Sequence, residues 1–207
     1  MTYLPVAPCT AGPAATVSSS PPFPVCDSDG PAVLTDLSPL IAATTRWLTG
    51  AYPAGGGALA SALCEVQARQ AVTVAAWLRY PTEIDAALVT MAGPGGSGRL
   101  DWITGAEQSA DTPAAEWAWR TWVDEVVASW AAALLTDPEL AGLAVDALAH
   151  GEHAGRTPVE FRRLLTPDDS DRTAAALLRH PDLVAPVAGL HHAQLRDRLD
   201  PGRALAA

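Results

Sequence analysis

The histidines and the acid beside them are the residues whose types and spacing suit metal chemistry. His150 and His153 are three residues apart with Glu152 between them, and on a helix this spacing places both imidazoles on one face. Imidazole and carboxylate groups are common zinc ligands, so these residues, joined by His191 or His192, form a candidate metal site. Glycines flank the cluster and indicate instead a helix end with solvated histidines.

The other catalytic patterns are incomplete. The sequence has no His-Glu-x-x-His motif and no glutamate three residues before a histidine, as di-iron bundles have. It contains no lysine, which excludes a phosphate-binding P-loop and a pyridoxal Schiff base. Cys9, Cys26 and Cys64 include no Cys-x-x-Cys pair. We therefore expect no cofactor and favour binding over catalysis, with enzymatic activity left open.

Four of the seven tryptophans lie within fourteen residues of one another. Trp119, Trp122 and Trp130 recur at helical spacing, which is typical of a core stripe. Trp117 falls off that stripe, so we expect it at the surface as a contact for a partner. A tryptophan-lined site for a small regulatory molecule is the alternative interpretation.

Capping residues and periodicity predict the helices that position these groups. Capping side chains are expected at the helix starts Ser38-Pro39, Thr82, Thr112-Pro113, Thr157-Pro158 and Thr166-Pro167. Asp137-Pro138 is expected to break one helix and start the next. We expect no strand pairing and an all-α helical bundle of about six to eight helices. The predicted helices are 39–49, 58–79, 83–91, 113–136, one from 138 onward, 158–165, 171–180 and 182–199, the last with breaks at Pro186 and Gly189. Within 58–79, the side expected to face the core carries Leu59, Leu63, Val66, Val74 and Trp77.

The first 35 residues differ from the rest in composition. They are rich in Pro, Ser, Ala and Gly, which suits no core element, so we expect a flexible or extended N-terminal arm. Its Tyr3 and Phe23 are candidates for contact with a surface. Residues 36–207 form the expected helical domain, with a candidate boundary at the glycine-rich 93–98 segment. Because no cation precedes Arg46 and no apolar run reaches membrane-spanning length, we expect a cytoplasmic protein outside the membrane.

The net charge of the chain and its distribution argue against one class of partner. The net charge is −10, and 101–171 holds fourteen of the 23 acids against four of the 13 arginines. A nucleic-acid binder needs a basic face, so we expect no nucleic acid partner. The absence of lysine and asparagine, both read from AT-rich codons, indicates a high-GC bacterium or its phage.

The sequence therefore favours a non-catalytic protein–protein interaction protein or a structural subunit of a larger assembly, in which the chain itself could form an oligomer. The alternatives are the helical metal-binding protein or enzyme built on the histidine cluster, and the small-molecule-binding regulatory domain.

Overall fold

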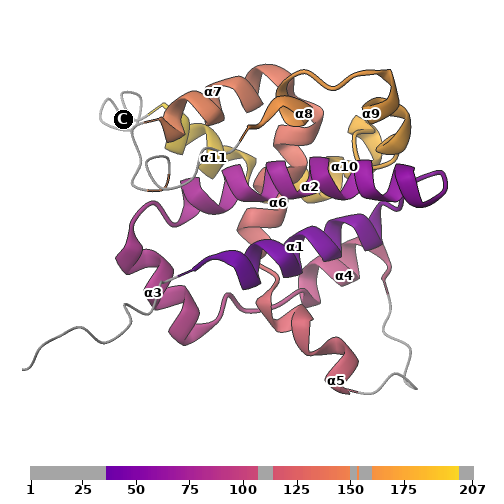
Figure 1. The fold of residues 1–207 in the computed structure, drawn as a ribbon. Coiled ribbons are helices and arrows are strands. Elements are labelled where there is room, and N and C mark those ends of the chain that lie inside the picture. The colour runs from indigo at the N-terminus through magenta and orange to yellow at the C-terminus, as the bar shows by residue number, and fades with distance from the viewer. Residues whose placement is uncertain (1–35, 107–113, 150–152, 154–159, 201–207) are drawn as a thin grey trace, which may run out of the picture. The chain divides into compact units, whose positions relative to one another are not determined.

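The computed structural model describes residues 36–106, 114–149, 153 and 160–200 (Figure 1). Contacts divide the chain into Met1–Val33 and Leu34–Ala207, and every element described below belongs to the second unit. The predicted all-α fold is confirmed, since the described residues form helices and no strand. The elements are α1 (Ser38–Ala51), α2 (Ala58–Arg79), α3 (Glu83–Ala92), α4 (Gly98–Thr104), α5 (Ala114–Trp117), the 3₁₀ helix η1 (Ala118–Trp122), α6 (Glu125–Thr136), α7 (Pro138–Leu148), α8 (Arg162–Leu165), α9 (Asp169–Ala174), α10 (Pro181–Ala188) and α11 (His192–Leu199).

Helix α2, with 22 residues, lies at the centre of the packing. Helices α1 and α6 pack along it, and α7, α8 and α9 contact it as well. In Figure 1, α1 and α2 lie side by side while α6 crosses them. The buried side of α2 is rich in small residues such as Ala68, Ala71 and Ala75, which allow neighbouring helices to approach closely.

The side of α2 that faces the core was predicted only in part. Val74 is buried and Trp77 packs against the core, but Leu59 is 75% exposed and Val66 is 40% exposed. The buried side instead follows the alanines together with Cys64 and Gln67. A stripe defined by large side chains misses such a face, because close helix packing selects small ones.

The predicted single helix over 113–136 is wrong. The chain forms α5 and η1, then runs extended through Val123 and Asp124 before α6 begins. The Asp124 carboxylate accepts a hydrogen bond from the backbone N–H of Val127 at 2.9 Å and so caps α6. An aspartate that can cap a new helix competes with continuation of the old one. The break separates the tryptophans of α5 and η1 from Trp130 in α6.

Two predicted helix starts are confirmed by their caps. The hydroxyl of Thr82 accepts from the backbone N–H of Asp85 at 3.1 Å, within a capping box. The carboxylate of Asp137 accepts from the backbone N–H of Leu140 at 2.9 Å, with Pro138 in the first turn of α7. In both caps the donor and the acceptor are three residues apart, so the local sequence alone is enough to predict them.

Two other predicted caps are wrong. Ser38 is the first residue of α1 rather than its cap, and its backbone N–H donates to Asp36 at 2.9 Å. In α9 the capping carboxylate is Asp168 and not Thr166. At the start of α9 a carboxylate, which is the stronger acceptor for an N–H at a helix start, takes the capping role, whereas no described side chain caps α1 from the N-cap position.

The predicted 171–180 helix is shorter than expected, since α9 begins at Asp169 and ends at Ala174. The predicted break of 182–199 at Gly189 is confirmed and separates α10 from α11, whereas the predicted break at Pro186 is wrong, since Pro186 lies inside α10. The glycine-rich segment before α4 turns with positive φ at Gly93, Gly95 and Gly96, a conformation that favours glycine.

The cap of α6 also holds the end of α2. Asp124 is nearly fully buried, and its second carboxylate oxygen accepts a hydrogen bond of 2.5 Å from the hydroxyl of Tyr80. Burial raises the pKa of Tyr80 above its ordinary value of 10, and the hydrogen bond and charge of Asp124 act in the same direction. One carboxylate thus joins a helix start and a helix end that are 44 residues apart.

We expect Asp124→Ala to destabilise the fold more than Asp137→Ala. Each change removes a cap, at a cost of about 1 kcal/mol, but Asp124→Ala also leaves the Tyr80 hydroxyl unpaired, at about 1–3 kcal/mol more. Urea unfolding followed by circular dichroism measures both. Equal losses for the two variants would contradict a joint role of Asp124.

We expect the free energy of unfolding to fall as pH rises above about 10. The folded state holds the Tyr80 proton more tightly than the unfolded state, so the contribution is complete below the ordinary pKa and decreases above it. Tyr80→Phe removes this group and should make the decrease between about pH 9 and pH 11 shallower. Parallel decreases in wild type and variant would show that Tyr80 is not the group responsible.

Candidate functional site

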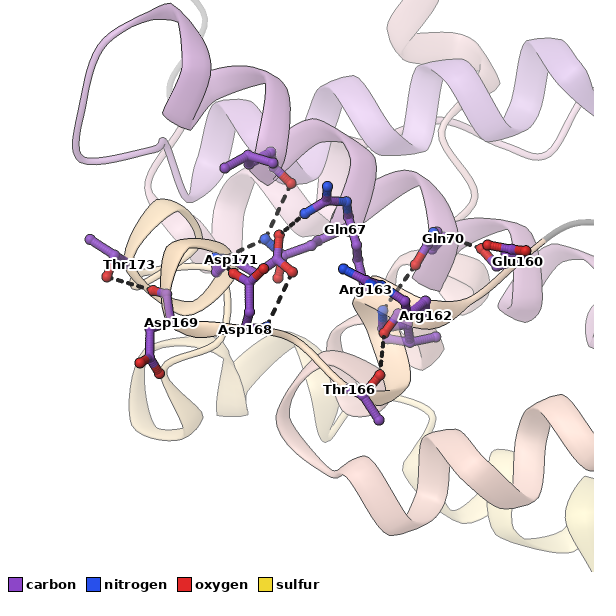
Figure 2. A network of polar contacts seen from close by, with 12 residues as sticks. Gln67, Gln70, Glu160, Arg162, Arg163, Thr166, Asp168, Asp169, Asp171 and Thr173 are labelled. Atoms are coloured by element: carbon purple, nitrogen blue, oxygen red, sulfur yellow. Dashed lines mark hydrogen bonds and ion pairs between the residues drawn. The ribbon is translucent and has the colours of Figure 1, made fainter.

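A closed polar network joins α2 to α8 and α9 (Figure 2). The side chain of Gln67 is fully buried, and its Nε2 donates to the carbonyl of Asp171 at 2.8 Å. The Asp171 carboxylate forms an ion pair with Arg163 and accepts from the backbone N–H of Asp168 at 3.2 Å. The network therefore fastens the first turn of α9 to the middle of α2.

Arg179 completes this network from the segment that follows α9. Its Nε donates to Oε1 of Gln67 at 2.6 Å, and its Nη atoms donate to the carbonyls of Leu135 and Arg163 at 3.1 and 2.7 Å. Burial lowers the pKa of Arg179, and the charge of Asp171 acts in the opposite direction. Since these groups find their acceptors within the chain, the network is suited to holding the fold.

The predicted metal ligands are placed at separate contacts. Nε2 of His153 lies 2.7 Å from the carbonyl of Tyr80, so this nitrogen is the donor, and the imidazole stacks on Trp77 with ring centres 5.6 Å apart. Nε2 of His191 lies 2.7 Å from a carboxylate oxygen of Glu125. His192 is the first residue of α11.

His150 and Glu152 lie outside the described residues. Within the part of the chain that the structure describes, no group of three or more His, Cys, Asp or Glu side chains is arranged to hold a metal ion. The metal hypothesis therefore remains a prediction.

Tryptophan and arginine side chains alternate in a stack between α1, α5 and η1. The guanidinium of Arg120 lies 4.5 Å from the ring centre of Trp117 and 5.2 Å from that of Trp119. A second guanidinium, that of Arg46 from α1, lies 4.5 Å from the ring centre of Trp119. We call these four residues the Trp–Arg ladder. Contacts of a cation with an aromatic face are attractive, so the ladder holds η1 against α1.

Asp101 of α4 anchors the ladder from behind. This nearly buried carboxylate forms an ion pair with Arg120 and accepts a hydrogen bond from the indole Nε1 of Trp47 at 2.9 Å. The hydroxyl of Ser97 donates to its other oxygen at 2.7 Å. Three segments thus meet on one carboxylate, which fixes the position of Arg120.

The ladder lines an open cavity of about 1000 Å³, which we call the Trp–Arg pocket. Its lining is Arg46, Trp47, Thr49, Gly50, Ala51, Ala106, Glu116, Trp117, Trp119 and Arg120. Two buried donors in this wall, Nε1 of Trp117 and Nε of Arg120, have no acceptor among the described residues. A buried donor without an acceptor costs about 1–3 kcal/mol, so these two atoms indicate an incomplete site.

A smaller hollow adjoins the pocket. It has a volume of about 300 Å³ and shares Ala51, the last residue of α1, with the Trp–Arg pocket. We call it the apolar hollow after its aliphatic side chains, although polar atoms line it as well; among the described residues its lining is Ala51, Tyr52, Ile103, Thr104, Leu177, Leu183 and Pro186. Between Asp101 and Ile103, the side chain of Trp102 is 83% exposed. Helix α4 therefore contributes Ile103 and Thr104 to the apolar hollow and presents the ring of Trp102 to solvent.

The sequence identified this region only through Trp117, which is half-buried and lines the pocket. Trp130 is a core residue as expected, whereas Trp119 and Trp122 are partly buried against the core. The roles of Arg46, Arg120 and Asp101 were missed, and the one available signal was the short run Trp117-Ala118-Trp119-Arg120, in which an arginine follows two closely spaced tryptophans. Tyr3 and Phe23, the other predicted contacts, lie outside the described residues.

No protein-family model, curated protein or solved structure matches this chain. Across the described residues, none of the helices has the length and apolar character needed to cross a membrane. The geometry of the chain itself is therefore what indicates its function.

We expect Gln67→Leu to destabilise the fold by about 3 kcal/mol, because it leaves a buried carbonyl and the partly buried, charged Nε of Arg179 unpaired. Gln70→Leu is the matched control, one turn along the same helix. Gln70 bonds the carbonyl of Glu160 and the backbone N–H of Leu164 nearer the surface, so a loss of about 1 kcal/mol is expected. Urea unfolding measures both, and an equal or smaller loss for Gln67→Leu would count against the network.

Proposed function

We propose that this chain is a non-catalytic protein–protein interaction protein of the cytoplasm, acting as a subunit of a larger assembly. The partner lies over the Trp–Arg pocket and the apolar hollow. The observation that carries this proposal is the open pocket lined by alternating tryptophans and arginines, joined at Ala51 to an apolar neighbour.

The residue types of the pocket are those that dominate binding energy between proteins. Tryptophan and arginine are enriched among the few interface residues whose truncation costs the most. Such residues act best in a pocket that a partner closes to water, and the ladder places four of them in one wall.

Exposed apolar side chains support a protein partner. Trp102 of α4 points to solvent, and Ile84, Leu88 and Met91 of α3 are exposed along one side of that helix. Large contiguous apolar surface is uncommon on proteins that act alone. A subunit of an assembly would cover such surface.

A small-molecule-binding regulatory domain is the second candidate function. A cavity of about 1000 Å³ is of the size that small ligands occupy, and the two unpaired donors could orient a ligand there once the Arg120 side chain shifts. The pocket is open and shares the lining residue Ala51 with the apolar hollow, which favours the longer contact of a protein segment.

We expect Trp119→Ala to weaken partner binding by about tenfold or more, because it removes the ring that both guanidiniums contact. The tagged full chain is expressed in its own host, cross-linked and compared quantitatively with Trp119→Ala and with Leu143→Ser, an exposed change on α7. The partner should be retained by Leu143→Ser and lost from Trp119→Ala, with both variants folded by circular dichroism. Equal capture by all three proteins would refute the role of the pocket.

A further inference from the structure

We propose that the partner segment places a carboxylate side chain in the Trp–Arg pocket and an aliphatic side chain in the apolar hollow. This inference rests on the proposed function and names the chemistry of the partner. It follows from the charge of the pocket, from its unpaired donors and from the character of the neighbouring hollow.

The charge of the pocket favours an anion. Among the described residues, its lining holds two guanidiniums, of Arg46 and Arg120, against one exposed carboxylate, that of Glu116. Asp101 pairs with Arg120 from behind, whereas Arg46 lies over Trp119 and has no carboxylate partner among the described residues. A guanidinium stacked on an aromatic ring keeps its N–H groups at the edge, where a carboxylate can accept two of them.

The unpaired donors add a second requirement for an acceptor. Nε of Arg120 and Nε1 of Trp117 are both closed to solvent and belong to stacked side chains, 4.5 Å apart between guanidinium and ring centre. A carboxylate reaches them only if the Arg120 side chain shifts. Binding is therefore expected to change the environment of Trp117 and Trp119.

The apolar hollow makes a peptide segment a better occupant than a free anion. Ile103, Leu177 and Leu183 surround it, and the latter two keep much of their surface exposed. Because both hollows have Ala51 in their linings, the proposed segment carries its acidic and its aliphatic residue a few positions apart, and the peptide series below tests that spacing.

The test uses acetylated and amidated peptides that carry one Glu and one Leu separated by one to four serines. Binding to the full chain is followed by tryptophan fluorescence and by the indole N–H signals. At least one spacing should bind about tenfold more tightly than the same peptide with Gln for Glu, or with Ser for Leu. The indole signals of Trp117 and Trp119 should move, and that of Trp130 should not.

Variants locate the effect. Arg46→Ala should remove the preference for Glu over Gln, because the unpaired guanidinium is lost. Arg69→Ala is the matched control, since this arginine is exposed on α2 and pairs with Glu65. It should leave the preference unchanged, and circular dichroism checks that both variants remain folded.

Three results would overturn the inference. They are equal binding of Glu and Gln peptides, a Glu preference that survives Arg46→Ala, and binding of hexanoate as tight as that of the best peptide. If the partner of the full chain still depends on Trp119 when the peptides fail, the proposed function stands and only the carboxylate chemistry is wrong.

Discussion

The arrangement of the C-terminal helices depends on the hydrogen bonds of one partly buried guanidinium, that of Arg179. A guanidinium has five N–H donors in a fixed plane and remains charged, so it can be buried only where acceptors surround it. Here the acceptors come from Gln67 of α2, Leu135 of α6, and Arg163 and Leu164 of α8. Three helices are thereby held in one geometry around a single side chain, and α10, which follows it, packs on α6.

The Trp–Arg ladder also contains guanidiniums, but some of their donors have no acceptor among the described residues. Around Arg179 the donors meet acceptors of the chain, whereas Arg120 keeps an unpaired Nε and Arg46 has an aromatic ring beside it but no acid. A network whose donors all have acceptors leaves none free to bind a ligand. Unpaired donors at the wall of an open pocket can bind one, and for this reason the ladder, rather than the more extensive network around Arg179, is the candidate binding site.

The elements that the sequence predicted well are those specified by neighbouring residues. The bounds of α2 and the caps of α3 and α7 follow from glycine, proline and capping side chains within a few positions. The features that it missed depend on contacts between distant residues. Asp124 ends one segment and starts another partly because Tyr80 reaches its carboxylate, and Asp101 joins Trp47 to Arg120 across three elements. Contacts between distant residues cannot be predicted from a local pattern. For that reason Trp117 is the one pocket residue that the sequence identified.

The alanine-rich contact between α2 and α6 has a consequence for how this chain can change over generations. Ala71 and Ala75 of α2, like Ala131 and Ala132 of α6, are fully buried. Where helices pack through alanine methyl groups, a smaller side chain removes little buried surface, whereas a larger one requires the neighbouring backbone to move. A single base change converts an alanine codon into one for valine, threonine or serine, so the commonest mutations at these positions enlarge the side chain. We therefore expect substitutions that enlarge these buried side chains to be the least tolerated. Steric exclusion then favours small residues at these positions, in addition to the codon bias of the sequence.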